Sequence, residues 1–592
     1  MRELEYPYKN EELILKKKKI KRELLEKTES FLNIKVAILA GSIVNELKDL
    51  LEIFLLNYGI KAEFYLSEYN RYYEDAVFEN ESLKSFNPDI VYVFTSSRNI
   101  IHDFDLSTNV SEIDNKLEEE YKKYLSIWQS IQSKYNAVVI QNNFEYPNYR
   151  LLGNKDISDV HGLSNFLSRL NTCFYQFAES NKSFYICDLN YIASNYGLSK
   201  WHNEKAYALY KLPCDLMAFP DIAFNVANII KSIYGKNKKA IAVDLDNTLW
   251  GGIVSEDGVD NLKVGPEIAE GEIFLDFQKY LKKLKSLGIL LNIVSKNDEA
   301  VALDGIEKTD GVLKKEDFVT INANWEPKSD NIIKLSNKLN LGADSFAFID
   351  DNPMERDIVR QNVDGIGVAN VTLPEEYIKE LDRAGFFEVT NVTSEDENKT
   401  KQYREKIERE NFKESFVDYK EYLKSLEMKA EIKAFEEKYY NRISQLSNKS
   451  NQFNLTTKRY TVEDIKRISN DKDYITLYGK LVDKFGDNGI VSLAIGKING
   501  SELNLELFLM SCRVLKREME FAMCDSLIEE CKKRNISKIN AEYIKTSKND
   551  MVKNLLAEFG FSKLSEDDKG NSKWELDELS SYTYKCSIID NG

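Results

Sequence analysis

Histidine, cysteine and proline are scarce in this sequence of 592 residues, and each shortage narrows the possible functions. Three histidines leave few positions for catalysis by an imidazole ring. The seven cysteines form no CxxC pair, which argues against a zinc knuckle and is typical of reduced, cytosolic thiols. With nine prolines and 43% hydrophobic residues, the composition is that of a globular protein with material for several cores.

The sequence also lacks an excess of basic charge and long apolar runs. The net charge is −16, with acidic and basic residues interspersed along most of the chain. An acidic surface repels phosphate backbones and anionic lipid, which argues against unspecific binding to nucleic acid or membranes. No apolar run is long enough to span a bilayer, and residues 11–27 mix glutamate with lysine instead of resembling a signal peptide. We therefore expect a cytoplasmic protein with no nucleic-acid or membrane partner.

The hydrophobic pattern divides the chain into three blocks, for which we expect an α/β multidomain fold. Residues 1–235 alternate apolar strands with amphipathic helices, a rhythm typical of a parallel sheet. Residues 236–390 continue this rhythm, whereas residues 391–592 open with a charged helical connector (394–424) before an α+β order of elements. The predicted strands are 34–40, 90–94, 137–141 and 184–189 in the first block, 240–243, 289–294 and 345–349 in the second, and 474–483, 490–497, 503–509 and 538–543 in the third.

Two carboxylates, Asp244 and Asp246 in the tract DLDNT, follow the buried strand predicted at 240–243. Ligands of parallel α/β sheets bind at the carboxyl ends of strands. Two residues apart in an extended strand end, both side chains point the same way. This arrangement suits a nucleophile that attacks phosphorus and an acid/base group that assists it. Such a tract alone is as often a surface turn or cap as a catalytic motif.

Three further elements follow in order, each at a strand end or in a loop. Ser295 ends the next strand, Lys328 offers a fixed positive charge, and Asp350-Asp351 ends another apolar strand. A hydroxyl and an ammonium group suit the oxygens of a phosphoryl group in transfer, and paired carboxylates suit Mg²⁺. Each element alone has an ordinary interpretation as a cap, a solvated lysine or a turn. Together the four predict a phosphoryl-transfer site with Mg²⁺ as cofactor.

The spacing after Asp246 limits what can cover this site. About 25 residues, many of them glycine, separate it from the helix predicted near residue 272. That length fits a flap hairpin and is too short for a separate cap domain. We therefore expect a site open to bulky or protein-bound substrates, unless a neighbouring domain covers it.

These tracts resemble the haloacid-dehalogenase superfamily and, more closely, its FkbH-like proteins. The tracts that carry the resemblance are DLDNTLWGG at 244–252, EDG at 256–258, SKND at 295–298, NWEPK at 324–328, FIDDNPMER at 348–356, NQFNLTTKR at 451–459, FGDNG at 485–489, SCRV at 511–514 and TSKN at 546–549. The resemblance implies roles for nine residues. They are Asp244 (nucleophile), Asp246 (acid/base), Ser295 and Lys328 (phosphate clamps); Thr248, Lys296 and Asn297 (substrate contacts); and Asp244, the Asp246 carbonyl, Asp350 and Asp351 (Mg²⁺ ligands).

The resemblance also implies a reaction. The enzyme would take the acyl phosphate 1,3-bisphosphoglycerate, remove phosphate, and place the glyceryl group on the phosphopantetheine thiol of an acyl carrier protein. Such enzymes supply polyketide-type biosynthesis. The alternative is a stand-alone phosphatase acting on a small sugar or acyl phosphate. A non-catalytic docking scaffold is an alternative of another class, against which the complete set of site residues argues.

The third block, by the same resemblance, is similar to N-acetyltransferases of the GNAT fold. In that fold a glycine-rich RxxGxG/A turn at a helix N-terminus binds pyrophosphate through backbone N–H groups. Here the tract is RVLKRE, with Lys516 and Glu518 where the glycines would stand. This departure argues against coenzyme A binding. Arg513, Lys516 and Arg517 instead offer charge for a phosphopantetheine phosphate or an acidic carrier protein.

Cys512 has two interpretations. It follows the strand predicted at 503–509 and stands beside basic residues, a setting that suits an acyl-carrying catalytic nucleophile. The alternative is a small residue that packs in a core.

The first block resembles SGNH-type esterases, in which a nucleophilic serine follows the opening strand as Ser42 does here. A working site also needs an aspartate three residues before a histidine near the domain's end, and His202 has none. Asn142 and Asn143 are candidates for oxyanion donors or for caps. We therefore expect a degenerate SGNH-like scaffold that docks the carrier protein or covers the central site.

Overall fold

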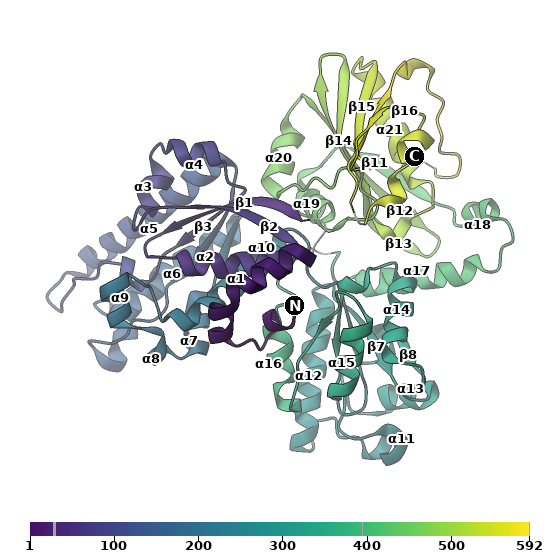
Figure 1. Ribbon diagram of the computed structural model, residues 1–592. Coiled ribbons are helices and arrows are strands. Elements are labelled where there is room, and N and C mark those ends of the chain that lie inside the picture. Colours follow the sequence, from purple (N-terminus) through teal and green to yellow (C-terminus); the bar gives the residue numbers. More distant parts are fainter. Residues whose placement is uncertain (28–30, 394, 547, 591–592) are drawn as a thin grey trace. The chain divides into compact units, whose positions relative to one another are not determined.

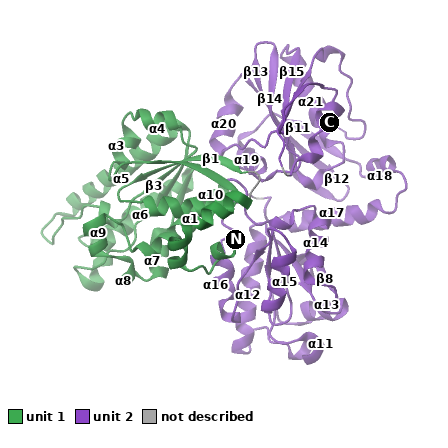
Figure 2. Ribbon diagram, viewed as in Figure 1, with its two compact units in different colours: residues 1–233 green, residues 234–592 purple. Residues whose placement is uncertain are grey.

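The computed structural model describes residues 1–27, 31–393, 395–546 and 548–590. The chain forms two compact units, Met1–Ile233 and Tyr234–Gly592 (Figure 2). The first unit contains one β-sheet and the second contains two, so the chain is an α/β multidomain protein, as predicted (Figure 1). The second unit joins the blocks expected at 236–390 and 391–592, and the three-domain division with a boundary near residue 390 stays a prediction.

The sheet of the first unit is parallel, with the strand order β2-β1-β3-β4-β5. Its strands are β1 (Leu32–Ala40), β2 (Ile60–Leu66), β3 (Ile90–Phe94), β4 (Val138–Asn142) and β5 (Phe184–Cys187). Its helices are α1 (Asn10–Lys27), α2 (Asn45–Asn57), α3 (Tyr72–Val77), α4 (Glu81–Phe86), α5 (Val110–Tyr135), α6 (Leu163–Ser180), α7 (Leu189–Tyr196), α8 (Leu198–Trp201), α9 (Glu204–Tyr210) and α10 (Phe219–Ile233). The four predicted strands are confirmed. The edge strand β2 escaped prediction because it is only partly buried and lacks a continuous apolar run.

Helix α10 corrects the expectation that no apolar run reaches membrane-spanning length. The segment Leu216–Ile233 is long and apolar enough to cross a bilayer by length and composition alone. However, 67% of it is buried inside the protein. The helix packs against α2, where the rings of Phe54 and Phe224 lie 5.3 Å apart. Burial against neighbouring helices accounts for its apolar composition.

The second sheet is also parallel, with the order β10-β9-β6-β7-β8. Its strands are β6 (Ala240–Val243), β7 (Leu290–Ser295), β8 (Phe318–Ala323), β9 (Phe346–Ile349) and β10 (Gly367–Val368). Its helices are α11 (Val254–Asp257), α12 (Ala269–Ser286), α13 (Glu299–Lys308), α14 (Lys328–Leu339), α15 (Pro353–Asn362) and α16 (Tyr377–Arg383). Ile241 and Val243 of β6 pack with α12, whereas Ala240 and Ala242 pack with α14 on the opposite face. Because both faces are covered, the strand is apolar until its carboxyl end, where polar residues begin.

The third sheet is mixed, with the order β11-β12-β13-β14-β15-β17-β16. Its strands are β11 (Lys429–Lys433), β12 (Tyr474–Asp483), β13 (Gly486–Asn499), β14 (Glu502–Met510), β15 (Lys538–Tyr543), β16 (Ser562–Glu566) and β17 (Ser572–Leu576). The accompanying helices are α17 (Lys399–Lys413), α18 (Tyr419–Ser425), α19 (Tyr440–Lys449), α20 (Val462–Asn470), α21 (Met519–Lys533) and α22 (Leu555–Glu558). The predicted connector corresponds to α17 and α18. Its first residue, Ser394, and Ser547 of the tract TSKN lie outside the described residues.

A segment of the tract NQFNLTTKR closes a gap in this sheet. Strands β14 and β15 pair in parallel only over Glu502–Leu505 and then separate. Beyond that point Leu455 N donates to Phe508 O, and Ile544 N donates to Leu455 O. The backbone of Leu455 therefore connects the carboxyl ends of β14 and β15 by hydrogen bonds.

Candidate functional site

The carboxyl ends of three neighbouring strands carry the polar residues of the site. Asp244 follows β6, Ser295 is the last residue of β7, and Asp350 follows β9. The order β9-β6-β7 makes these parallel strands adjacent, so their carboxyl ends meet at one edge of the sheet. All three side chains are buried. The fold thus brings together residues that are about a hundred positions apart in sequence.

Three carboxylates and one ammonium group form the centre of this site. Ligand oxygens of Asp244, Asp350 and Asp351 all lie within 4.8 Å of one another. Lys328, the first residue of α14, has its Nζ 2.9 Å from Asp244 Oδ1 and 2.6 Å from Asp350 Oδ2. A single ammonium group leaves excess negative charge on the cluster, and a further cation would balance it.

Burial sets the acid–base behaviour of the cluster. It raises the pKa of Asp244 to about 6; the Lys328 ammonium group acts against this rise, and the Asp350 carboxylate adds to it. Burial also raises the pKa of Asp350 and of Asp351. For Lys328, burial acts to lower the pKa, but the carboxylates of Asp244 and Asp350 raise it above its ordinary value. These shifts describe carboxylates crowded into a poorly solvated place, an environment that favours cation binding.

Asp246 lies outside the three-carboxylate cluster, and its own carboxylate is held by neighbouring donors. The indole Nε1 of Trp250 and the backbone N of Val254 each donate to its Oδ1 at 3.0 Å. The side chain of Asn297 donates to its Oδ2 at 2.8 Å. Trp250 and Val254 were missed by sequence reasoning; the signal available was the tract LWGG directly after DLDNT.

The residues predicted as substrate contacts have protein partners in this structure. Besides Asn297, Thr248 Oγ1 accepts a hydrogen bond from Asp351 N at 3.1 Å, and Lys296 pairs with Glu355 at 2.6 Å. Thr248 thereby ties the end of β6 to the end of β9. Arg356, also missed from sequence, donates through Nη1 to the carbonyls of both residues in the Asp350-Asp351 pair. These bonds fix the strand ends around the carboxylates.

Cys512 belongs to a different part of the second unit. It follows β14, and its Sγ lies 3.9 Å from the hydroxyl of Tyr403 in α17. It packs against an apolar cluster of the second sheet that contains Val363. Among the described residues, no hydrogen bond or ion pair joins Cys512 to the carboxylates. These contacts support the packing interpretation.

The basic residues after Cys512 are used mostly inside the fold. Arg513 is buried and hydrogen-bonds to Gln402 of α17. Arg517 is buried, and its Nη1 lies 3.0 Å from Asp483 Oδ2. Lys516 alone among the three is exposed. The contacts of the two arginines therefore give no support to the prediction that they bind substrate.

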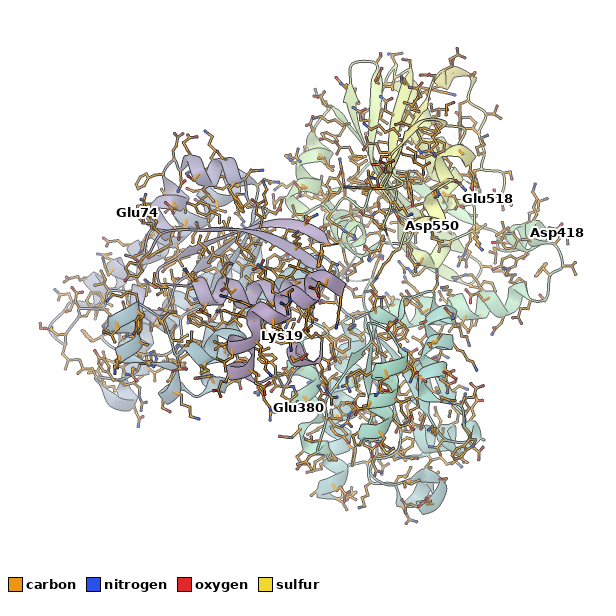
Figure 3. All side chains as sticks on the ribbon, viewed as in Figure 1. Lys19, Glu74, Glu380, Asp418, Glu518 and Asp550 are labelled. Atoms are coloured by element: carbon orange, nitrogen blue, oxygen red, sulfur yellow. The ribbon has the colours of Figure 1, made fainter. Side chains whose placement is uncertain are left out.

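The turn before α21 keeps a glycine-like backbone without glycine. Lys516 and Glu518, which stand at the two glycine positions of the motif, have φ values of 62° and 64°. This left-handed region favours glycine, so both residues hold a strained backbone conformation. Glu518 lies at the start of α21, and its carboxylate accepts a hydrogen bond from Ser587 N at 3.1 Å (Figure 3). Glu518 thus places its carboxylate directly before the first residue of α21.

Ser42 of the first unit forms no catalytic hydrogen-bond network among the described residues. Ser42 is only 3% exposed, and its Oγ has no hydrogen-bond partner among the described residues. His202 bonds through Nε2 to a backbone carbonyl instead. Asn142 exchanges hydrogen bonds with the backbone of Thr95, and Asn143 donates to a tyrosine hydroxyl and to an aspartate. Both asparagines therefore act as structural connectors between strand ends.

Comparison with known proteins agrees with this description. The family model described as FkbH, N-terminal domain, matches residues 35–231. The structure of the N-terminal part of protein BF1531 from Bacteroides fragilis, which contains a phosphatase domain complexed with Mg, is 30% identical. It covers 63% of this chain and 99% of its own, with a TM-score of 0.59.

Two acetyltransferase structures are similar to a quarter of the chain. The ribosomal-protein-S18-alanine N-acetyltransferase from Escherichia coli is 14% identical, covering 25% of this chain and 94% of its own, with a TM-score of 0.21. A GNAT-family acetyltransferase from Streptococcus pneumoniae is 13% identical, covering 25% and 99%, with a TM-score of 0.22. No curated protein matches the sequence. On the extent of the Bacteroides fragilis match and of the N-terminal family model, the chain belongs to the FkbH-like proteins and contains a haloacid-dehalogenase-like phosphatase domain.

Proposed function

We propose that the carboxylate site of the second unit is a phosphotransferase centre acting on a small phosphorylated substrate. The observation that carries this proposal is the convergence of Asp244, Asp350 and Asp351 within 4.8 Å, beside the Lys328 ammonium group. Crowded, poorly solvated carboxylates with one fixed cation are suited to hold a metal ion and a phosphoryl group together.

Magnesium fits the residues of this site. Mg²⁺ prefers carboxylate oxygens, and Asp244, Asp350 and Asp351 each offer one within reach of a single ion. The Bacteroides fragilis structure is a complex with Mg. We propose that these three residues hold the ion, with the Asp246 carbonyl as a further ligand. When bound, Mg²⁺ supplies positive charge that offsets the charge of the phosphoryl oxygens.

The protein residues have distinct proposed tasks. A carboxylate oxygen of Asp244 forms a bond to phosphorus while the bond from phosphorus to the leaving oxygen breaks. Asp246 gives a proton to the leaving oxygen and later takes one from the water that hydrolyses the aspartyl phosphate. Ser295 and Lys328 hold the phosphoryl oxygens throughout. The products are the dephosphorylated substrate, inorganic phosphate and regenerated Asp244.

The finer proposal is that the substrate is 1,3-bisphosphoglycerate and that its glyceryl group passes to a carrier-protein thiol. Hydrolysis at the acyl phosphate would leave a carboxylate that no longer acylates a thiol. Asp244 must therefore remove the ester phosphate, while sulfur attacks the acyl carbon and the acyl-bound phosphate leaves. The family resemblance supports this scheme, and Cys512 is its candidate intermediate acyl carrier. The packing of Cys512 favours the alternative, a stand-alone phosphatase on a sugar or acyl phosphate.

One experiment separates these functions. The full chain is mixed with Mg²⁺, 1,3-bisphosphoglycerate and a holo acyl carrier protein, and both phosphate release and the mass of the carrier are measured. Phosphate release with a glycerylated carrier supports the transferase. Phosphate release without a carrier adduct supports the stand-alone phosphatase. If Asp244→Asn retained full phosphate release, the proposed centre would be wrong.

A further inference from the structure

The flap, residues 247–268 between Asp246 and α12, is anchored to the Asp246 carboxylate by a tryptophan. Trp250 forms a β-bridge with Asp246, and its Nε1 donates to Asp246 Oδ1 at 3.0 Å. The indole is only 1% exposed and packs over Gly305 of α13, where a Cβ would come within 3.0 Å of the ring. The absence of a side chain at Gly305 leaves the space that the indole fills. The position of Trp250 is therefore set from two sides.

A second donor reaches the other oxygen of Asp246 from a different element. Asn297 lies two residues after the end of β7, is 1% exposed, and donates from Nδ2 to Asp246 Oδ2 at 2.8 Å. Val254 N, in the first turn of α11 on the flap, adds a second bond to Oδ1. Asp246 Oδ1 is thus held by the flap, and Asp246 Oδ2 is held by the loop that follows β7.

We propose that Trp250 and Asn297 are positioning residues that together fix the orientation of the Asp246 carboxylate, so that the packing of the flap sets the geometry of proton transfer. The inference rests on the proposed acid/base role of Asp246. Trp250 and Val254 both hold Oδ1, and both belong to the buried core of the second sheet. Without their bonds the carboxylate is held only through Oδ2. The bond to Asn297 alone permits rotation of the carboxylate, whereas the two-sided clamp does not.

The clamp has a consequence that depends on the leaving group. An alkoxide leaving from a phosphate monoester needs a proton when the bond to phosphorus breaks, whereas a carboxylate leaving from an acyl phosphate does not. Hydrolysis of the aspartyl phosphate needs a correctly placed base with either substrate. Loss of the clamp should therefore slow the first step only for the monoester, and should slow the second step for both.

The test compares Trp250→Phe and Asn297→Ala with the wild type by rapid quench. The probes are acetyl phosphate and glycerol phosphate, each with Mg²⁺. With acetyl phosphate we expect phosphorylation of Asp244 within about twofold of wild type and hydrolysis slowed at least about tenfold, so that the phosphoenzyme accumulates. With glycerol phosphate we expect phosphorylation itself to slow at least about tenfold. Equal slowing of every step with both probes, or no slowing, would overturn the inference.

A matched control exists in the first unit. Trp128 is fully buried, and its indole N–H donates to Gln141 Oε1 at 3.1 Å. Trp128→Phe removes the same kind of buried bond from the core of the other unit, and we expect wild-type rates with both probes. Defects in Trp128→Phe that match those of Trp250→Phe would mean a general loss of structure and would overturn the inference.

A second measurement does not depend on activity. The chain has five tryptophans, and the ¹⁵N indole signal of Trp250 is identified by its loss in Trp250→Phe. Asp246→Ala should shift that signal and leave the Trp128 signal in place. An unmoved Trp250 signal would refute the clamp even in an active enzyme. If Asp246→Ala shifts the signal but the wild-type protein transfers no phosphate, the clamp is supported and the proposed function is refuted.

Discussion

Both the first and the second sheet carry buried polar side chains at the carboxyl ends of parallel strands. In the first sheet these groups mostly satisfy one another: Asn142 bonds to the backbone of Thr95, and Glu145 accepts from Ser97 N and Oγ. In the second sheet Asp244 and its carboxylate neighbours share a single lysine. The two sheets are both parallel but differ in strand order, and buried polar groups at their carboxyl ends have different surroundings.

The difference shows what makes a strand end a candidate site. A buried polar group with a protein partner contributes to the fold and has little left for a ligand. Carboxylates that converge without enough positive charge instead destabilise the fold until a cation or another ligand balances them. The second sheet has this imbalance, so reactivity is expected there. Ser42 Oγ also has no hydrogen-bond partner within the described part of the chain, but a neutral hydroxyl does not create a comparable electric field.

The largest expected effect separates the two edges by activity. Asp244→Asn should reduce phosphate release by at least about a thousandfold, because the amide cannot form the aspartyl phosphate. Ser42→Ala in the first unit should leave the rate unchanged. Phosphate release from acetyl phosphate measures both. A loss of activity in Ser42→Ala would show that the first edge takes part in the reaction and would break the comparison.

A second effect concerns stability at the carboxylate edge. Lys328→Met leaves the carboxylates of Asp244 and Asp350 without their ammonium partner. Removing one member of a buried ion pair costs about 3–5 kcal/mol of unfolding free energy. Denaturant unfolding without Mg²⁺ measures this loss. Lys334→Met removes an exposed pair with Glu326 and should cost less than about 1 kcal/mol. Equal losses in both variants would mean that Lys328 does not balance the carboxylates.

Much of this contrast was visible in the sequence. Apolar runs predicted β6, β7 and β9, and the polar residues directly after them predicted which side chains would share an edge. The pairing of Asp246 with Trp250 and Asn297 was not predictable, because it depends on how the flap folds back across the strand end. The spacing of a motif shows which residues are close in sequence. It does not determine the side-chain rotamers that bring two of them into contact.

The basic tract after β14 shows a limit of the same reasoning. Its charges suggested a phosphate or carrier-protein site, and yet Arg513 and Arg517 are buried against Gln402 and Asp483. Both partners lie far away in sequence, in α17 and at the end of β12. From the sequence, a charged residue next to a turn is expected to be exposed. The sequence does not show the distant residues that can pair with it in the fold. Lys516 fits that interpretation, being exposed, but its two arginine neighbours do not.

A third effect sharpens the comparison by metal addition. Mg²⁺ at about a hundred times its dissociation constant should stabilise the folded chain by about 3 kcal/mol, provided that it binds only the folded state. Hydrogen exchange should slow near Asp244 and Asp351 and stay unchanged near Thr95 and Glu145. Asp351→Asn should abolish most of the gain. If Mg²⁺ slowed hydrogen exchange only in the first unit, the cation would bind there and the proposed site at Asp244 would be wrong.

The smallest expected effect is the pH dependence of stability that Glu145 contributes. Burial raises the pKa of this glutamate above its ordinary value of 4.5, although hydrogen bonds from Ser97 act in the opposite direction. The folded state therefore binds the proton more tightly than the unfolded state, so this contribution is complete below the ordinary pKa. This contribution is lost as the pH rises through the raised pKa.

Glu145→Gln removes the titration, so the unfolding free energy of the variant relative to wild type should rise with pH from weakly acidic to neutral conditions. Denaturant unfolding of both proteins across this range measures the difference. A variant that instead lost stability relative to wild type as the pH rose would show that the ionised carboxylate is the form the first edge favours, and the two edges would then differ less than their hydrogen bonds indicate.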